Sequence, residues 1–382
     1  MRVFAVLIGL GMIGTVLIDT FETILQPRRV THKYRFARFF YRTNWRFWTL
    51  IARTVPAGKR RESMLAYFGP LSLLELFSAW VIGLVFGFAL VNWGAGERIL
   101  TADSPINFFS YLYMSGTTFF TLGYGDVTPL GYFGRAMAVT ESGLGFAFLA
   151  MIISYLPSTT QAFSSRETTI SLLDARASSP PCAAQLLVRL ARGGNMAELS
   201  SFLAEWERWS AELLESHLSF PVLSYFRSQH DNQSWLAAIT CMLDTCAIVM
   251  AEVKGNKPYR AQLTFAMARH AVVDLSLIFG TGLVNPESDR LPPETRIELH
   301  KALREAGLEL HGDAESAAKL TELRGMYEPF VGGLSKRFLF ALPPIFFEGE
   351  SIDNWQRSRG MRRAPGLGNL ATGDGADEHF GS

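Results

Sequence analysis

The chain has 382 residues, of which 48% are hydrophobic and 19% are charged, and its formal net charge is +1 at pH 7. A mean hydropathy of +0.15 is the average expected of a chain that is half membrane-embedded and half cytosolic. Three cysteines (Cys182, Cys241 and Cys246) form no C-x-x-C metal pattern and are too few for a disulfide scaffold. These features exclude a small secreted module, a zinc ribbon and a disordered chain.

Three apolar stretches occupy the N-terminal part of the chain, at about 3–25, 68–93 and 134–156. A helix needs about 20 mostly apolar residues to cross a bilayer, and the second and third stretches meet that length comfortably. The first is uninterrupted only as far as residue 18, so a secretory signal is its alternative interpretation. Because only Arg2 precedes it and no small-residue cleavage site follows it, we predict that residues 1–26 form a retained N-terminal transmembrane helix.

The connection between the first two spans, residues 27–63, is strongly basic. Its cations are Arg28, Arg29, Lys33, Arg35, Arg38, Arg42, Arg46, Arg53, Lys59, Arg60 and Arg61. Cationic loops stay on the cytoplasmic side of a membrane. We therefore predict a multi-pass protein of the cell membrane, in keeping with a bacterial inner membrane, whose N-terminus is outside and whose C-terminus is cytoplasmic.

Part of the basic connection has the periodicity of a helix. Arg35, Arg38, Arg42 and Arg46 recur at helical spacing, with aromatic and aliphatic side chains between them. This pattern predicts a basic amphipathic helix that lies on the inner membrane surface, and it makes residues 28–61 a candidate contact for anionic lipid. A solvated cytosolic linker is the alternative interpretation.

A short apolar and aromatic run at 107–120 lies between the second and third spans and is too short to cross the bilayer, which predicts a re-entrant helix. The residues that follow it are Thr121, Leu122, Gly123, Tyr124, Gly125 and Asp126. A dehydrated cation needs a ring of oxygens in place of its water, and backbone carbonyls supply that ring only if they point toward one axis. The two glycines allow the backbone angles that such an arrangement requires.

The side chains of the same segment fit an ion pathway. The hydroxyl of Thr121 adds an oxygen below the carbonyls, and the ring of Tyr124 can brace the loop sideways. Asp126 places negative charge at the outer mouth. Non-helical backbone at membrane depth is tolerated only where protein buries it or where it lines water. We therefore predict that residues 121–126 line an ion-conducting pore.

This segment and its flanking helices resemble the pore domain of potassium channels, in particular the bacterial channels with two pore-forming helices. The resemblance covers roughly residues 68–156 within a pore domain that we place at 64–157. It implies an all-α membrane protein with K⁺ as its permeant ion, no cofactor and no enzymatic activity. It implies an outer helix at 68–93, a pore helix at 107–120, a filter at 121–124 and an inner helix at 134–156. Leu122 departs from the more usual Val or Ile, and Phe120 stands where the family often has a second threonine.

Because one chain carries one such loop and four loops close the ring, we expect a homotetramer. Glu141 lies within the third span, and we expect it to face protein and bond to the pore helix. Gly143 and Gly145 are predicted to form a gating hinge, with close helix packing as the alternative. Asp19 and Glu22 could pair with nearby arginines at the inner interface or be solvated there.

The C-terminal half is predicted to be helical. After a Ser- and Thr-rich linker at 158–181, helical periodicity recurs at 196–217, 233–253, 258–279, 293–308 and 313–330. We assign residues 182–345 to a helical cytosolic domain and predict that the tail at 346–382, rich in Gly and Ala, is largely disordered. No G-x-G-x-x-G follows a strand, which argues against a nucleotide-binding Rossmann regulator.

Two polar groupings of this half remain as weaker candidates. His270 and Asp274 share one helix face and could bind a divalent metal with His217 or His230, although an ordinary hydrogen-bonded pair is the alternative. We expect no metal site beyond the permeant K⁺. The polar turn at 227–234 could hold a ligand or a subunit contact, or simply cap the next helix.

These observations predict a potassium-selective channel that conducts K⁺ passively through a tetrameric TLGYGD filter and is gated by an unidentified cytosolic signal. A weakly selective cation channel is one alternative, and a non-conducting membrane-anchored sensor or scaffold with a relic pore is another. The near-zero net charge gives no indication of a nucleic-acid partner, and none is expected.

Overall fold

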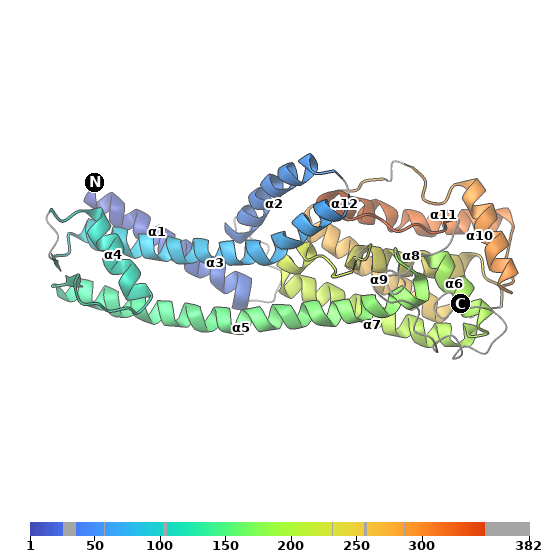
Figure 1. Ribbon diagram of the computed structural model, residues 1–382, viewed down its shortest axis with the longest axis horizontal. Coiled ribbons are helices and arrows are strands. Elements are labelled where there is room, and N and C mark those ends of the chain that lie inside the picture. The colour runs from blue at the N-terminus through green and yellow to red at the C-terminus, as the bar shows by residue number, and fades with distance from the viewer. Residues whose placement is uncertain are drawn as a thin grey trace, which may run out of the picture. The chain divides into compact units, whose positions relative to one another are not determined.

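The computed structural model describes residues 1–25, 36–56, 58–101, 105–230, 232–255, 258–285 and 288–347, and this part of the protein is nearly all helical (Figure 1). Two compact units divide the chain. The first contains Met1–Gln161 and Leu218–Phe226, and the second contains Ala162–His217 and the described residues from Arg227 onward.

The elements of the first unit are α1 (Arg2–Thr20), the π-helical turn η1 (Phe21–Leu25), α2 (Phe36–Thr54), α3 (Lys59–Ala95), β1 (Ile99–Leu100), α4 (Phe108–Phe119), β2 (Thr128–Pro129), the N-terminal part of α5 (Tyr132–Ala177) and the 3-10 helix η3 (Pro221–Tyr225). Those of the second unit are the C-terminal part of α5, α6 (Ala183–Arg192), η2 (Met196–Glu198), α7 (Leu199–Ser219), α8 (Trp235–Ala251), α9 (Tyr259–Phe279), α10 (Pro293–Glu305), α11 (Ala314–Gly325) and α12 (Glu328–Phe338). Only the end of α7, from Leu218, falls in the first unit.

Among the described residues, three helical segments are long and apolar enough to cross a membrane: Arg2–Ile24, α3 and α5. They coincide with the three predicted apolar stretches, and the two-residue strands β1 and β2 are the only paired strands in the described part of the chain. The predicted all-α membrane architecture is therefore confirmed, including the additional N-terminal helix. The basic connection at 26–35, with four of its predicted cations, lies outside the described residues.

The helix α5 continues far beyond the predicted inner helix and through most of the segment assigned as a linker. Ser158, Thr159 and Thr160 each donate a side-chain hydroxyl to the carbonyl four residues earlier, at 3.0 Å. Hydroxyl groups that bond within the helix in this way need no partner outside it. A Ser- and Thr-rich composition, which favours a loop, is here compatible with an uninterrupted helix as far as Ala177.

Glycines bring α1 and α3 into close contact. A Cβ atom at Gly9 would lie 2.6 Å from the carbonyl oxygen of Gly87, and one at Gly94 would lie 2.8 Å from that of Arg2. Neither position can accept a larger side chain without separating the two backbones. Small residues at a helix interface are the usual means of close packing in a bilayer, so α1 is packed as part of the membrane bundle.

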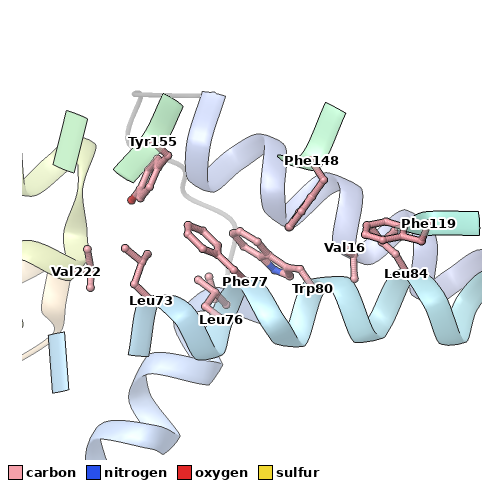
Figure 2. Close-up of a cluster of buried hydrophobic side chains, with 11 residues drawn as sticks. Val16, Leu73, Leu76, Phe77, Trp80, Leu84, Phe119, Phe148, Tyr155 and Val222 are labelled. Atoms are coloured by element: carbon pink, nitrogen blue, oxygen red, sulfur yellow. The ribbon is translucent and has the colours of Figure 1, made fainter. Parts of the chain in front are cut away.

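An apolar cluster joins α1, α3, α4 and α5 within the first unit (Figure 2). At its centre Trp80 of α3 is fully buried, and its indole nitrogen donates to Asp19 Oδ2 of α1 at 2.8 Å. The same carboxylate accepts from the backbone nitrogen of Ala37, at the start of α2, at 3.0 and 3.1 Å. Asp19 is thus a buried cap that ties α2 to two transmembrane helices, a role that neither predicted alternative included.

The second unit is built around α8, which is buried along nearly its whole length. Asp244 of α8 accepts hydrogen bonds from Arg290 Nη1, at 3.1 Å, and from the hydroxyl of Tyr327. Its charge is therefore balanced inside the unit. The helices α7, α8, α9 and α10 match their predicted stretches. The predicted helix at 313–330 is instead two helices separated at residues 326–327, and α6 was not predicted. All but the first two residues of the predicted disordered tail lie outside the described residues.

Candidate functional site

The predicted filter segment has an unusual backbone. Thr121, Gly123 and Gly125 have positive φ angles of 57°, 58° and 75°, whereas Leu122 and Tyr124 between them do not. Where left-handed residues alternate with right-handed ones, successive peptide units turn the same way, so that their N–H groups face one side and their carbonyls the other. Every second residue of the segment thus has the left-handed conformation that allows carbonyls to align.

The first of these left-handed residues is not a glycine. A left-handed conformation costs a residue with a Cβ atom roughly 1–3 kcal/mol, and such outliers cluster at functional sites. The end of α4 holds Thr121 in place, because its backbone nitrogen donates to Thr118 O at 3.0 Å and that of Leu122 donates to Thr117 O at 2.8 Å. The segment is therefore a direct continuation of the C-terminal turn of α4.

The helix α4 leads directly into the predicted filter, and its two ends differ in partial charge. Asn107 caps its first turn by accepting from the backbone nitrogen of Phe109 at 2.9 Å. Its C-terminal end, at which the aligned peptide dipoles give a helix a partial negative charge, leads into residues 120–122. Negative potential at that end favours a cation near the inner end of the segment.

A hydrogen bond fastens the outer end of the segment. Tyr113 of α4 donates its hydroxyl to Asp126 Oδ2 at 2.8 Å, and Asp126 Oδ1 accepts from the backbone nitrogen of Val127 at 3.1 Å. The prediction placed Asp126 at the mouth but did not identify Tyr113 as its partner. Tyr113 lies thirteen positions earlier on the short helix, so only the fold brings the two together.

The filter side chains have little cover within the chain itself. All six residues from Thr121 to Asp126 are exposed, and the ring of Tyr124 is 69% accessible. The predicted bracing of the loop by Tyr124 is therefore a contact that the described part of one chain does not supply.

Behind the segment, a buried polar contact joins three helices. Ser115 of α4 donates to Glu141 Oε1 of α5 and also lies 2.8 Å from the carbonyl oxygen of Val85 in α3. Glu141 is 1% exposed. The structure thus places Glu141 against the pore helix, as the sequence predicted, and Ser115 is the residue that sequence reasoning missed.

The two inner-helix glycines differ in their surroundings. A Cβ atom at Gly145 would lie 2.0 Å from the carbonyl oxygen of Phe119, the last residue of α4. At Gly143 nothing lies within 4 Å of the same atom. Close packing therefore explains Gly145, whereas it does not explain Gly143, at which a hinge stays a prediction.

The outer turn between α3 and α5 is fastened by Glu97. Its carboxylate accepts from the backbone nitrogens of Gly131 at 2.6 Å and Gly134 at 3.3 Å, which lie at the start of α5. Its carbonyl oxygen accepts from the hydroxyl of Tyr111 in α4 at 2.7 Å. A carboxylate at the N-terminus of a helix balances the partial positive charge there, so Glu97 fixes the start of the inner helix beside α4.

The helix α2 carries the predicted basic pattern. Arg38, Arg42, Arg46 and Arg53 are exposed, while Ala37, Trp45 and Ala52 on another side are buried. Its large exposed apolar side chains are Phe36, Phe39, Phe47, Leu50 and Ile51. A helix with separate basic and apolar exposed stripes suits the boundary between headgroups and acyl chains.

The weaker candidates of the second unit do not assemble into a metal site. His270 Nε2 lies 3.5 Å from Asp274 Oδ2, as an ordinary pair four residues apart. His217 is instead fully buried beside Arg166, and burial lowers its pKa to about 3. No group of three or more potential metal ligands occurs among the described residues. In the polar turn, Ser234 caps α8 by accepting from the backbone nitrogen of Ala237 at 3.0 Å.

A cavity of about 460 Å³ lies beside α10 and α11 in the second unit. Among its lining residues, Arg296 already bonds to Glu252 with its Nη2 2.7 Å from Oε1, and Arg324 bonds to Glu328 with its Nε 3.0 Å from Oε1. The charges of these arginines are thus balanced by carboxylates of the same unit.

Comparison with known proteins places the central part of the chain among channels. A family model described as an ion channel matches residues 75–162. Protein LctB of Geobacillus stearothermophilus is 33% identical over 96 residues, which cover 21% of this chain and 71% of LctB. LctB of Bacillus caldotenax is 31% identical over 101 residues, covering 22% and 69%.

A longer similarity joins this chain to an uncharacterized membrane protein, YdjJ of Bacillus subtilis (strain 168). The two are 22% identical over 236 residues, which cover 61% of this chain and 68% of YdjJ. No solved structure matches the chain significantly. The longer similarity therefore extends beyond the residues that the family model matches.

Proposed function

Because this chain belongs to the ion-channel family, we propose that four copies of it surround one axis and conduct K⁺ through residues 121–126. The observation that carries the proposal is the alternation of left-handed residues at Thr121, Gly123 and Gly125. With this alternation, four copies present stacked rings of carbonyl oxygens that replace the water around a dehydrated cation. Binding at several adjacent rings keeps each site weak enough for the ion to leave.

Potassium selectivity follows from the same backbone. Leu122, in place of the more usual Val or Ile, still contributes a carbonyl oxygen. Its apolar side chain has no group that could bind an ion. Phe120, in place of a second threonine, contacts Phe119 with ring centroids 5.5 Å apart. The hydroxyl that is missing at residue 120 is therefore replaced by aromatic packing at the end of α4, while Thr121 keeps the hydroxyl of the filter.

The fourfold assembly is supported by what the single chain leaves exposed. Irregular backbone at membrane depth must be covered by protein or lie against water, yet residues 121–126 are all exposed in one chain. The inner helix α5 also exposes Val139, Phe146 and Leu149 at 76%, 71% and 55%. Neighbouring copies of the chain would cover the loop, brace Tyr124 and leave the carbonyls open to the axis.

The membrane orientation follows from the basic helix. With the arginines of α2 at the cytoplasmic surface, the C-terminal unit is cytoplasmic and the protein lies in a cell membrane, such as a bacterial inner membrane. The exposed stripe of Phe39, Phe47 and Leu50 would enter the acyl region, with the arginines at the phosphates of anionic lipid. Gly143, whose surroundings are open, would serve as the hinge of the inner helix.

Potassium flux into liposomes that hold the purified protein tests the proposal. We expect flux with the wild type, none with Gly123→Asp, and wild-type flux with Gly194→Asp. Gly194 is a matched control because its φ of 69° and its open surroundings resemble those of Gly123, but it lies in the second unit. Flux that persists in Gly123→Asp rejects the filter assignment.

Two further measurements decide between the alternatives. Native mass spectrometry in detergent is expected to give four copies. Reversal potentials in mixed K⁺ and Na⁺ are expected to lie near the K⁺ potential, and values near zero would favour a weakly selective cation channel. A tetramer without any flux would favour the membrane-anchored sensor.

A further inference from the structure

A short segment between α7 and α8 belongs to a different unit from the helices on either side of it. Residues 218–226, which include η3, are part of the first unit, although the chain before and after them is part of the second. Val222 of this segment is 2% exposed and lies in the same buried cluster as Leu73, Phe77 and Tyr155 (Figure 2). The segment is thus built into the core of the membrane bundle.

Aromatic rings fix the segment to α2 and α3. The ring of Tyr225 lies 5.0 Å from those of both Trp45 and Phe68, and 5.9 Å from that of Tyr41, onto which it stacks at an interplanar angle of 14°. Tyr225 is 4% exposed and Trp45 is 2% exposed. Rings packed this closely have few alternative positions, so a displacement of Tyr225 must also displace the two helices.

The segment also contacts the helix that would line the pore. Phe220 packs edge to face against Tyr155 of α5, with ring centroids 5.3 Å apart. At the other end, the ring of Phe226 covers Gly69 of α3 so closely that a Cβ atom there would lie 2.5 Å from it. The segment therefore touches α2, the base of α3 and α5 at the same time.

Both ends of the segment are attached to residues anchored in the second unit. His217, which precedes it, is fully buried, with its Nδ1 2.7 Å from Leu213 O and its ring 5.1 Å from that of Trp235. Arg227, which follows it, donates from Nη1 to Leu339 O at 3.2 Å, and its guanidinium lies 4.0 Å from the ring centroid of Phe340. At both ends, therefore, the chain leads from the segment directly into residues that are held by contacts within the second unit.

We propose that residues 218–226 are a coupling segment through which the second unit shifts the equilibrium between the closed and open pore. This inference rests on the proposed channel function. A change of the second unit would displace the ends at His217 and Arg227, and the rings of Phe220 and Tyr225 would pass that displacement to α5, α2 and α3. The segment thus provides a path to the pore besides the continuous helix α5.

Single-channel recordings of the full-length protein in planar bilayers test the coupling. Tyr225→Ala removes the ring that contacts α2 and α3, and Arg227→Gln releases the end that is held by the second unit. We expect both to shift the closed-to-open ratio in the same direction by about 5- to 150-fold, the usual range of coupling between sites. Because both break one path, the double variant should shift it no further than the larger single variant.

Matched controls come from the start of α9. Tyr259→Ala removes an exposed tyrosine, and Arg260→Gln removes an arginine whose partner, Glu207, is also in the second unit. Neither lies in the coupling segment or among the contacts given for it above, and both should leave the ratio within about twofold of the wild type. An unchanged ratio in Tyr225→Ala and Arg227→Gln, or effects that multiply in the double variant, would overturn the proposal.

Hydrogen exchange provides a second measurement that does not depend on conduction. In Arg227→Gln, the amides of Leu223 and Phe226 and those of α3 near Gly69 should exchange faster than in the wild type, while those of α1 should not. If the wild type carries no current, the channel function fails, whereas unchanged exchange in a folded Arg227→Gln protein rejects the coupling segment alone. Should Tyr225→Ala not assemble, Gly69→Ala tests a different contact of the same segment, the one between α3 and the ring of Phe226.

Discussion

The predicted filter segment, residues 121–126, exposes its polar groups, whereas the ion cluster around Asp244 in the second unit buries and pairs them. At residues 121–126 every residue is exposed. At Asp244 the carboxylate is completely buried, yet Arg290 and Tyr327 from the same unit satisfy it. One region is satisfied within a single chain, whereas under the proposed function the other is completed by an ion and by further copies of the chain.

The difference has a physical basis in what each region must do. A buried charge without a partner costs several kcal/mol, so a carboxylate used only for folding is paired inside the unit. A group that must bind and release an ion has to keep its oxygens free of permanent donors. We therefore expect variants of the ion cluster to change the stability of the second unit, and variants of the filter to change conduction.

The largest expected effect is that of Arg290→Met. Nη2 of Arg290 lies 2.5 Å from Asp244 Oδ2, and Nη1 lies 3.2 Å from Glu328 Oε1, a carboxyl group whose pKa is raised by burial. Removing the guanidinium takes the cation away from the buried carboxylate of Asp244, while Glu328 keeps its pairing with Arg324. We expect the free energy of unfolding of the second unit to fall by about 3–5 kcal/mol, measured by denaturant unfolding followed by tryptophan fluorescence.

The matched control for Arg290→Met is Arg260→Met. Arg260 pairs with Glu207 at 3.3 Å, and both side chains are largely open to solvent. A surface pair of this kind contributes only about 0–1 kcal/mol. Equal losses for the two variants would mean that the cluster around Asp244 is not the buried centre of the unit.

The effect expected of acid over about the first two pH units below 6.5 is smaller than that of Arg290→Met. His217 has an ordinary pKa of 6.5, and burial, with Arg166 beside it, lowers that pKa to about 3 in the folded unit. Between these values the unfolded chain binds a proton that the folded chain excludes. Stability is therefore complete above about pH 6.5 and falls as the pH drops toward 3, by about 1.4 kcal/mol per pH unit.

The emission of Trp235, whose ring lies 5.1 Å from that of His217, offers a local signal for this acid unfolding. His217→Gln should flatten the dependence of stability on pH between 6.5 and 4. His270→Gln, at a histidine whose side chain is 59% exposed, should keep the wild-type slope. A slope that survives in His217→Gln would assign the acid sensitivity to other groups.

The sequence was informative wherever local chemistry determines the structure. The glycines at 123 and 125 indicated a left-handed backbone because few other residues adopt it, and both have it. The spans were predictable because a bilayer demands long apolar helices. Only the structure could distinguish a hinge from close packing at Gly143 and Gly145. Phe119 lies against Gly145 and not against Gly143, and sequence periodicity does not indicate where Phe119 lies.

Contacts between distant parts of the chain were not predictable from one sequence. Asp19 is 61 positions from Trp80, and Tyr225 is far from both Trp45 and Phe68 along the chain. Periodicity describes which face of a helix is buried, but it does not identify the partner that buries it. The same limit applies to Tyr113 and Asp126, which the turn after α4 brings together.

The smallest expected effect tests the role of the hydrogen bond between Tyr113 and Asp126. Tyr113→Phe removes only the hydroxyl that donates to Asp126 at 2.8 Å, a loss of about 1 kcal/mol for a partly exposed hydrogen bond. If the bond steadies the outer end of the filter, the mean open time in K⁺ should shorten by about fivefold. Tyr111→Phe is the matched control, because its hydroxyl on the same helix bonds at 2.7 Å to the carbonyl of Glu97 and not to the filter segment. Equal shortening in both variants would show that α4 as a whole, rather than the contact with Asp126, steadies the open filter.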